Sequence, residues 1–284
     1  MNGLLIINKP INWTSRDVVN KVGHILNTSK IGHTGTLDPI ATGVLVLAIG
    51  EGLKLVDLVT SETKEYIATA KIGILTDTLD VTGNVLEEKN STIEKEQLEY
   101  VLNSFIGKYL QEVPLYSSVK VNGRRLYDYA RNNIKVELPR REVEIFDIEL
   151  LSFNKEEFSF RVSVSKGTYI RSLIRDIGNK LDIPCTMSSL ERTKQGDFYI
   201  EDSYNISDIE NGFFELVSFN KALSRFKTVE VDDYLEKKVS NGVPLENRYD
   251  EDYVVFVNKE SKVLALYKLS EDKKRIKPYK VFNL

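Results

Sequence analysis

Residues 32–43 read GHTGTLDPIATG, and this stretch fits neither the period of a helix nor that of a strand. Before it, Thr14–Asp17 has the pattern of a capping box, and apolar residues recur at helical spacing as far as Leu26. After it, Val44–Ile49 is an uninterrupted apolar run that predicts a buried strand. A loop between a capped helix and a buried strand is a candidate functional site.

Asp38 is the only acidic residue of this loop, and it precedes Pro39. The proline disfavours helical backbone angles at Asp38 and supplies no N–H of its own. An Asp-Pro pair in isolation is a common turn. Within this loop, however, we interpret Asp38 as a carboxylate that the loop presents to a ligand.

Strand and helix patterns outside the loop are mixed without strict alternation. Alternating or continuous apolar residues predict strands at residues 3–9, 66–72 and 158–164. Helical spacing over residues 170–181 predicts a helix, so Tyr169 and Arg171 lie at a strand-to-helix junction, where free backbone N–H groups favour anions. A capping-box pattern at Ser91–Glu94 predicts the start of another helix.

Residues 120–141 carry a local excess of positive charge. Seven Lys and Arg residues stand there against two acidic ones, and Tyr127 and Tyr129 are interleaved with them. Basic residues with interleaved aromatic rings predict a surface that binds nucleic acid.

The pattern loosens after about Asp202. Short strand-like runs separated by polar turns follow at residues 253–257, 263–267 and 279–282. These runs predict a small, β-rich second domain. We place the domain boundary between residues 1–225 and 226–284.

The composition excludes several classes of protein. The 284 residues include 39 Lys and Arg against 42 Asp and Glu, a net charge of −3, so the chain is not basic as a whole. Cys185 is the single cysteine and there are two histidines, which excludes an internal disulfide and a structural zinc site. No apolar run approaches the roughly 20 residues that span a bilayer, and Met1 is not followed by a charged signal-peptide start, so we expect a cytoplasmic protein. The glycine-containing loop lacks the Lys-Ser/Thr pair of a phosphate-binding loop, which argues against nucleotide chemistry.

Single residues carry little weight by themselves. A lone histidine such as His33 is usually a hydrogen-bonded structural residue. Tyr66 and Tyr169 are two of 14 tyrosines, and most tyrosines are half-buried packing residues. Asp77 and Asp80 could join the loop carboxylate as metal ligands, but acidic residues in surface turns are far commoner, and no histidine or glutamate cluster supports a metal site.

Several segments, taken together and in order, resemble the bacterial-type tRNA pseudouridine-55 synthases over most of residues 3–198. These segments are Asn8-Lys9-Pro10, residues 32–43, Lys64-Glu65-Tyr66, residues 111–131 (QEVPLYSSVKVNGRRLYDYAR), residues 166–173 (KGTYIRSL) and Leu190-Glu191-Arg192-Thr193. The resemblance implies an α+β fold, with a catalytic domain on a largely antiparallel sheet and a small C-terminal β-rich domain of the PUA type. It also implies an enzyme that isomerises uridine 55 in the T-loop of tRNA without a cofactor or metal.

The resemblance implies roles for single residues as well. Asp38 would act at the ribose C1′, as a nucleophile or as the group that starts glycal formation, and attack at C6 stays open as a third route. The target uridine would be flipped out of the RNA stack. The implied partners of the base are Tyr66 stacked on it, Arg171 in a salt bridge to Asp38, Tyr169 and Leu190 in the pocket wall, and His33 in the gap left in the RNA stack.

The basic stretch corresponds in the family to a mobile, RNA-gripping insertion, in which phosphate contacts supply salt-dependent affinity. The residues expected to contact RNA are Lys9, Lys120, Arg124, Arg125, Arg131 and Arg141. The expected partner is the T-arm stem-loop of tRNA, bound by a monomer. Two positions depart from the family: Glu191 stands where a basic residue is commoner, and Val113 stands where many relatives have a second proline.

Two rival interpretations make different predictions. A non-catalytic RNA-binding or tRNA-folding protein would bind RNA through the basic stretch and form no new nucleoside. A metal-dependent nuclease that used Asp38, Asp77 and Asp80 would require a divalent ion.

Overall fold

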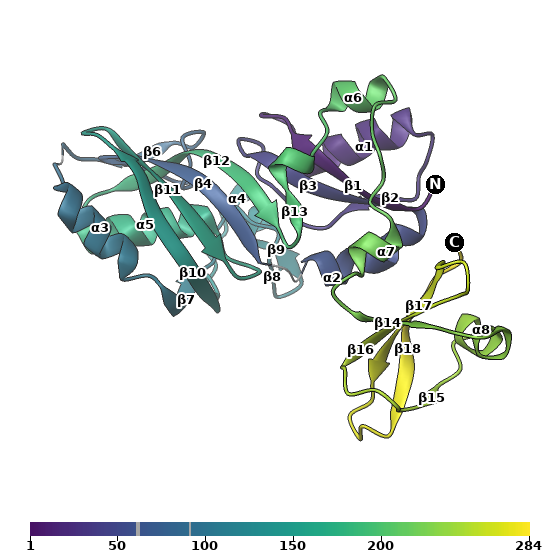
Figure 1. Cartoon of the computed structure of the whole chain (residues 1–284). Helices are drawn as coiled ribbons and strands as arrows, with labels where there is room; N and C mark the ends of the chain where they lie inside the picture. Colours follow the sequence, from purple (N-terminus) through teal and green to yellow (C-terminus); the bar gives the residue numbers. More distant parts are fainter. Residues whose placement is uncertain (61–62, 91) are drawn as a thin grey trace.

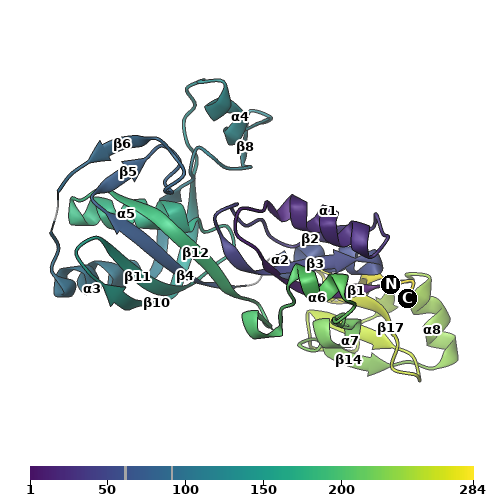
Figure 2. The same cartoon turned by 90° about the horizontal axis from the view of Figure 1, so that it is seen from above.

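The computed structural model describes residues 1–60, 63–90 and 92–284. A long twisted sheet with helices packed against it forms the larger part of the molecule, and a smaller C-terminal sheet lies beside one end of it (Figure 1). The two ends of the chain lie close together in both views (Figures 1 and 2).

The larger sheet has nine strands. They are β1 (Gly3–Lys9), β2 (Ile31–His33), β3 (Thr42–Ile49), β4 (Lys64–Ile72), β7 (Gly107–Glu112), β10 (Arg140–Phe153), β11 (Glu157–Val164), β12 (Cys185–Gln195) and β13 (Phe198–Tyr199). The order is β1-β3-β12-β4-β11-β10-β7, with β2 added to β3 and β13 to β12. Among these described strands, only β3 and β12 run parallel, through Glu191 opposite Thr42 and Arg192 opposite Gly43. The largely antiparallel α+β sheet is therefore confirmed.

Residues 4–7 of β1 and 44–49 of β3 are continuously apolar because both faces of these strands are covered. Leu5 and Ile7 point into a first core, which also contains Val18 and Val22, whereas Leu4 and Ile6 point into a second core on the opposite face. Burying one such side chain contributes about 1.5–3 kcal/mol. This double burial fixes β3, which begins where the loop at residues 32–43 ends, together with β1 beside it.

Most helical residues of the first core come from α1 (Ser15–Ile25), α3 (Lys95–Asn103) and α5 (Ile170–Leu181). The capping box of α1 is present, since Asp17 N donates to Thr14 Oγ1 at 3.1 Å and Thr14 N donates to Asp17 Oδ2 at 2.9 Å. Helix α3 begins after Glu94, later than the capping pattern predicts, and Ser91 lies outside the described residues.

Short elements connect this framework. They are η1 (Gly50–Leu55), α2 (Val56–Thr60), the hairpin of β5 (Ile74–Thr76) and β6 (Val85–Glu88), η2 (Ile200–Asp202), α6 (Ile206–Glu210) and α7 (Phe219–Ala222). The chain after β13 returns along β1, where Val217 bridges to Leu4 and Tyr204 bridges to Ile7. These bridges cover the outer edge of β1.

The basic stretch forms a separate projection that Figure 2 shows standing away from the main sheet. It contains β8 (Lys120–Val121), β9 (Arg124–Arg125) and α4 (Leu126–Arg131). Asn122 (φ +50°) and Gly123 (φ +79°) form the turn of the hairpin, and an Asn-Gly pair suits a two-residue turn that needs positive φ at both positions.

The C-terminal part has five strands in the order β14-β16-β17-β18-β15 and one helix. These elements are β14 (Lys227–Glu230), α8 (Asp233–Ser240), β15 (Leu245–Glu246), β16 (Tyr253–Val257), β17 (Val263–Leu269) and β18 (Arg275–Val281). One face has its own core around Phe256 and Tyr267, and the other face packs with Leu4 and Ile6 of β1. The small β-rich second unit is confirmed. No described helix is long and apolar enough to cross a membrane.

Candidate active site

The start of α1 fixes the loop at residues 34–41 through hydrogen bonds. Ser15 is buried, and its hydroxyl accepts from Leu37 N at 2.9 Å and donates to Leu37 O at 3.3 Å. Within the loop, Ala41 N donates to Asp38 O at 3.0 Å. The backbone on both sides of Asp38 is therefore fixed, while the Asp38 side chain remains 32% exposed.

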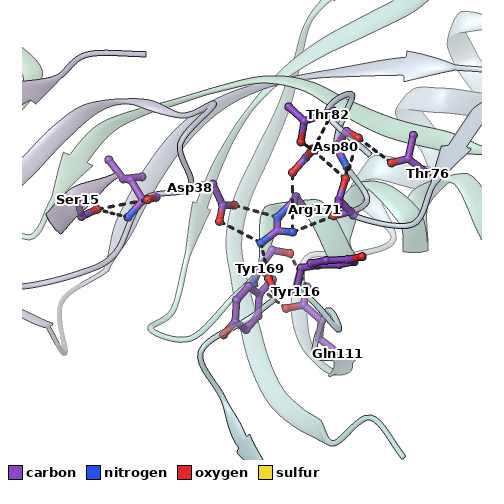
Figure 3. A network of polar contacts seen from close by, with 11 residues as sticks. Ser15, Asp38, Thr76, Asp80, Thr82, Gln111, Tyr116, Tyr169 and Arg171 are labelled. Atoms are coloured by element: carbon purple, nitrogen blue, oxygen red, sulfur yellow. Dashed lines mark hydrogen bonds and ion pairs between the residues drawn. The ribbon is translucent and has the colours of Figure 1, made fainter. Parts of the chain in front are cut away.

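Asp38 and Arg171 form a two-pronged ion pair (Figure 3). Arg171 Nε donates to Asp38 Oδ2 at 2.9 Å, and Arg171 Nη2 donates to Asp38 Oδ1 at 3.0 Å. Arg171 is 5% exposed, near the start of α5, so the contact joins a buried cation to a partly exposed carboxylate. Bidentate pairs of this kind are strong and fix the carboxylate's orientation. The salt bridge that the resemblance implies is present.

The other nitrogen contacts of Arg171 reach parts of the chain that the sequence pattern does not connect. Arg171 Nη1 donates to Thr78 O at 2.8 Å, and Nη2 also donates to Tyr116 O at 3.1 Å. Tyr116 stands at the root of the basic projection. One guanidinium therefore links the loop of Asp38, the β5–β6 hairpin and that root.

Asp80 is a second carboxylate beside Arg171, and its sequence pattern suggested only a metal ligand or a surface turn. Its side chain is 8% exposed, and Asp80 Oδ2 lies 3.9 Å from Arg171 Nη1. Asp80 Oδ1 accepts hydrogen bonds from Thr78 Oγ1 at 2.9 Å and from Thr82 N at 3.0 Å. The local sequence holds no signal for this role, because a carboxylate between two hydroxyl residues in a polar turn can face either water or an arginine.

The three carboxylates of the nuclease interpretation do not form a common site. Arg171 lies between Asp38 and Asp80, and the carboxylate of Asp77 accepts instead from Asn84 N at 2.8 Å and Asn84 Nδ2 at 3.0 Å. Among the described residues, no group of three or more His, Cys, Asp or Glu is placed to hold a metal ion.

Tyr66 and Leu190 lie on neighbouring central strands. Tyr66 of β4 is paired with Arg192 of β12, and Leu190 is paired with Ala68, so Tyr66 and Leu190 share a face of the sheet. Both are 7% exposed, and both belong to the core that also contains Leu37 of the loop.

Tyr169 caps the N-terminus of α5 and is held by Gln111, a residue whose role the sequence pattern did not predict. Gln111 Nε2 donates to Tyr169 O at 3.0 Å, and Tyr169 N donates to Gln111 Oε1 at 2.8 Å. Gln111 is fully buried, and the guanidinium of Arg141 lies 5.3 Å from the centre of the Tyr169 ring. Figure 3 shows Tyr169 on the same side of Arg171 as Tyr116. The buried amide thus fixes the backbone from which α5 begins.

His33 is the last residue of β2 and is half-buried. Its Nδ1 is buried and has no hydrogen-bond partner among the described residues. Burial and the nearby charges of Arg192 and Arg16 lower the pKa of His33, so the ring is neutral at pH 7.

Lys9 lies in the interior and not on an RNA-facing surface. Its side chain is 0% exposed, and Nζ donates to Pro10 O at 2.8 Å, Trp13 O at 2.6 Å and Pro39 O at 3.2 Å. The expected RNA contact of Lys9 does not fit this enclosure, because all three N–H groups of the ammonium are taken by backbone carbonyls. Lys9 contacts instead the residue that follows Asp38.

The remaining basic residues are accessible. Lys120, Arg124, Arg125 and Arg131 are exposed, and Arg141 is half-buried. Arg124 lies over the ring of Tyr129 and Arg131 over that of Tyr127, each at 5.6 Å from the ring centre. These cation–π contacts hold guanidinium groups at the surface of the projection.

Comparison with known proteins gives consistent results. A family model described as "TruB family pseudouridylate synthase (N terminal domain)" matches residues 23–170. A protein of Clostridium tetani named tRNA pseudouridine synthase B is 46% identical, with 87% of each chain covered. A protein of Staphylococcus aureus (strain MSSA476) with the same name is 43% identical, with 99% of each chain covered.

The fold has close structural counterparts. The structure described as "Crystal Structure of a Cbf5-Nop10-Gar1 Complex" is similar with a TM-score of 0.73 and 25% identity, covering 99% of this chain and 84% of that one. "Structure of H/ACA RNP bound to a substrate RNA containing 2'-deoxyuridine" is similar with a TM-score of 0.74 and 24% identity, covering 99% and 85%. The second likeness concerns the fold alone.

Proposed function

Because the chain belongs to the TruB family of pseudouridylate synthases, we propose that it isomerises uridine 55 in the T-loop of tRNA to pseudouridine. The names of the Clostridium and Staphylococcus relatives support tRNA as the substrate. The protein acts on the T-arm as a cytoplasmic monomer, with residues 1–225 as the catalytic domain and 226–284 as a PUA-like RNA-binding domain.

The observation that best supports the proposal is the bidentate ion pair of Asp38 and Arg171. The reaction breaks the C1′–N1 bond of the uridine, turns the base and forms a C1′–C5 bond. C5 then loses its proton and N1 takes up a proton, so the product is an isomer of the substrate. The reaction consumes no water and changes no oxidation state, so a single well-oriented carboxylate suffices. Arg171 orients Asp38, because the two-pronged contact fixes the plane of the carboxylate.

The base enters a pocket made by the residues around this pair. Tyr66 stacks on the flipped uracil, and Tyr169 and Leu190 form the wall. A largely apolar wall around Asp38 excludes water and strengthens the contact of its carboxylate with the substrate. The neutral ring of His33 fills the space that the uridine leaves in the RNA.

The projection grips the RNA backbone. Lys120, Arg124, Arg125 and Arg131 are exposed on it, and Arg141 of β10 lies over the ring of Tyr169. Phosphate contacts of this kind supply affinity that depends on salt and little on base sequence.

The test compares wild-type protein with Asp38→Asn on an unmodified tRNA transcript and on the same transcript with cytidine at position 55. Digestion to nucleosides, with fragment mapping, reports pseudouridine and its position, and a parallel arm contains a chelator. Wild-type protein should form pseudouridine at position 55 only, with or without the chelator, and Asp38→Asn should bind tRNA and form none, because an amide is a very poor nucleophile and base.

Each contrary result has a distinct meaning. Tight tRNA binding by wild-type protein without pseudouridine would favour the RNA-binding interpretation. Shortened RNA that appears only without the chelator would favour the nuclease. Pseudouridine formed by Asp38→Asn would remove Asp38 from the chemistry.

A further inference from the structure

Arg192 is a buried arginine to which the proposed reaction assigns no role. Its side chain is 1% exposed and is the largest of the fully buried side chains among the described residues. On β12 it is level with Gly43 of β3 on one side and with Tyr66 of β4 on the other. Arg192 therefore lies where the end of the Asp38 loop meets the strand that carries the stacking tyrosine.

The backbone of Arg192 touches the end of the loop. Gly43 has φ +94°, and a Cβ atom at this position would lie 2.3 Å from the carbonyl oxygen of Arg192. Only glycine permits both this approach and this backbone conformation. The parallel contact between β3 and β12 is therefore tight at the residue where the loop ends.

The side chain of Arg192 binds the loop at Gly35 and β3 at Val44. Arg192 Nε donates to Val44 O at 2.6 Å, and Nη2 donates to Gly35 O at 3.2 Å. A Cβ atom at Gly35 would lie 3.4 Å from Nη1, so the guanidinium lies directly against the loop. One rigid planar group thus connects backbone positions on either side of Asp38.

Burying the positive charge of Arg192 at this position costs free energy. The hydrogen-bond partners of its side chain are both carbonyl oxygens, and no described carboxylate forms an ion pair with it. Cations lie nearby, since the charge of Arg192 is among the causes that lower the pKa values of Lys9 and His33. A well-packed neutral side chain would avoid this penalty. Stability of the fold alone therefore does not account for a guanidinium here.

We propose that Arg192 is a positioning residue for the pseudouridine reaction, which fixes the loop so that Asp38 meets the ribose of a uridine stacked on Tyr66. This inference rests on the proposed function. The role depends on the fork of nitrogen donors, because two carbonyls on opposite sides of Asp38 must be bound at once. Lysine would keep the charge but place all of its N–H donors on one nitrogen, and methionine would keep most of the length with neither charge nor donors.

The experiment measures single-turnover pseudouridine formation, tRNA affinity and the free energy of unfolding for wild-type protein, Arg192→Lys and Arg192→Met. Cys185→Ala is the matched control, because Cys185 is buried at the first residue of the same strand, where it lies opposite Ile72 and not beside the loop. Arg192→Met should lower the rate constant by about 100-fold, the effect expected of a reacting group misplaced by about 1 Å, with tRNA affinity unchanged. Arg192→Lys should recover part of this loss, and Cys185→Ala should lose stability without losing rate.

The outcomes separate this inference from the function on which it rests. Wild-type protein that forms no pseudouridine would overturn the proposed function, and this role of Arg192 with it. An active wild type with an equally fast Arg192→Met would overturn the positioning role alone. A fall in the rate constant of Cys185→Ala that accompanies its loss of stability would also overturn the positioning role, because any destabilised core would then slow the reaction. Failure of both Arg192 variants to fold would overturn it as well, because Arg192 would then serve general stability.

Discussion

Arg171 lies beside two carboxylates, those of Asp38 and Asp80, and the contribution of Asp80 can be tested by replacing it alone. Asp80→Asn keeps an oxygen acceptor for Thr78 and Thr82 but removes the charge 3.9 Å from Arg171 Nη1. We expect Asp80→Asn to bind tRNA normally and to lower the single-turnover rate constant about tenfold, which corresponds to about 1.4 kcal/mol of transition-state stabilisation.

Asp77→Asn is the control for Asp80→Asn. Asp77 belongs to the same turn, but its carboxylate is bonded by Asn84 and not by Arg171. The two variants should therefore differ in rate. Equal rates would show that Asp80 does not act through Arg171.

Lys9 predicts a pH dependence. Burial lowers the pKa of Lys9 from 10.5 to about 8, although the charge of Asp38 acts in the opposite direction. Below pH 8 the ammonium donates to all three backbone carbonyls, including that of Pro39, and above it the neutral amine has only two N–H groups. The rate constant for pseudouridine formation should therefore fall as the pH rises through about 8.

The stability of the protein should change in the opposite direction over this range. The unfolded chain binds the Lys9 proton up to pH 10.5 and the folded chain only to about 8, so this residue makes the free energy of unfolding rise between these values. Lys9→Met should lose the alkaline fall in rate. Lys64, whose pKa burial also lowers to about 8, is the control, and Lys64→Met should retain the fall. The same alkaline fall in Lys9→Met would assign it to another group.

At the residue scale, the sequence predicts a contact only where a recognised motif contains the residues that make it. The pair of Asp38 and Arg171, 133 positions apart, was predicted only through the family resemblance. The buried state of Lys9 was not predicted, because lysine is ordinarily exposed and its partners are backbone carbonyls that leave no side-chain signal. The role of Asp80 was not predicted because a carboxylate in a polar turn has the same local pattern whether it faces water or an arginine.

The contribution of the basic projection to tRNA binding can be measured from the salt dependence of the affinity. Replacing Arg124, Arg125 and Arg131 with Ala should weaken tRNA binding for all tRNA sequences. The slope of log affinity against log salt should flatten by roughly 0.7–0.9 for each phosphate that the protein no longer neutralises. Replacing the exposed Lys95 and Lys155 on other elements is the control and should leave the slope unchanged. A slope that also stays constant in the triple variant would mean that the projection does not contact phosphates.

Secondary structure was easier to predict than the pairing of strands. Alternation identified β4 and β11, and helical spacing identified α5, because each has one apolar face. The parallel contact of β3 with β12 was not predicted, since periodicity says which residues form a strand but not which strand lies beside it. The start of α3 was predicted too early, because its N-cap Glu94 makes no side-chain capping bond and leaves no capping signal.

At the scale of the whole molecule, the C-terminal sheet shares a core with β1 and β3. Phe282 is 5% exposed, and its ring packs edge-to-face on Phe219 with ring centres 4.9 Å apart. Phe282→Ala should lower the free energy of unfolding in urea by about 3 kcal/mol, because it leaves a cavity between the two units. Tyr100→Ala, at a side chain that is 77% exposed, should have no such effect. A C-terminal unit that unfolds in a separate, earlier transition in the wild type would contradict a common core.

This shared core has a consequence for folding during synthesis on the ribosome. The ribosome makes β1 well before it makes Val255 and Phe282, which share a core with Leu4 and Ile6. At roughly 5–20 residues per second, the outer face of β1 waits about a quarter of a minute to a minute for its partner. The nascent chain therefore displays an apolar strand surface until β18 leaves the exit tunnel. During this interval the exposed apolar surface makes the nascent chain prone to misfolding and aggregation.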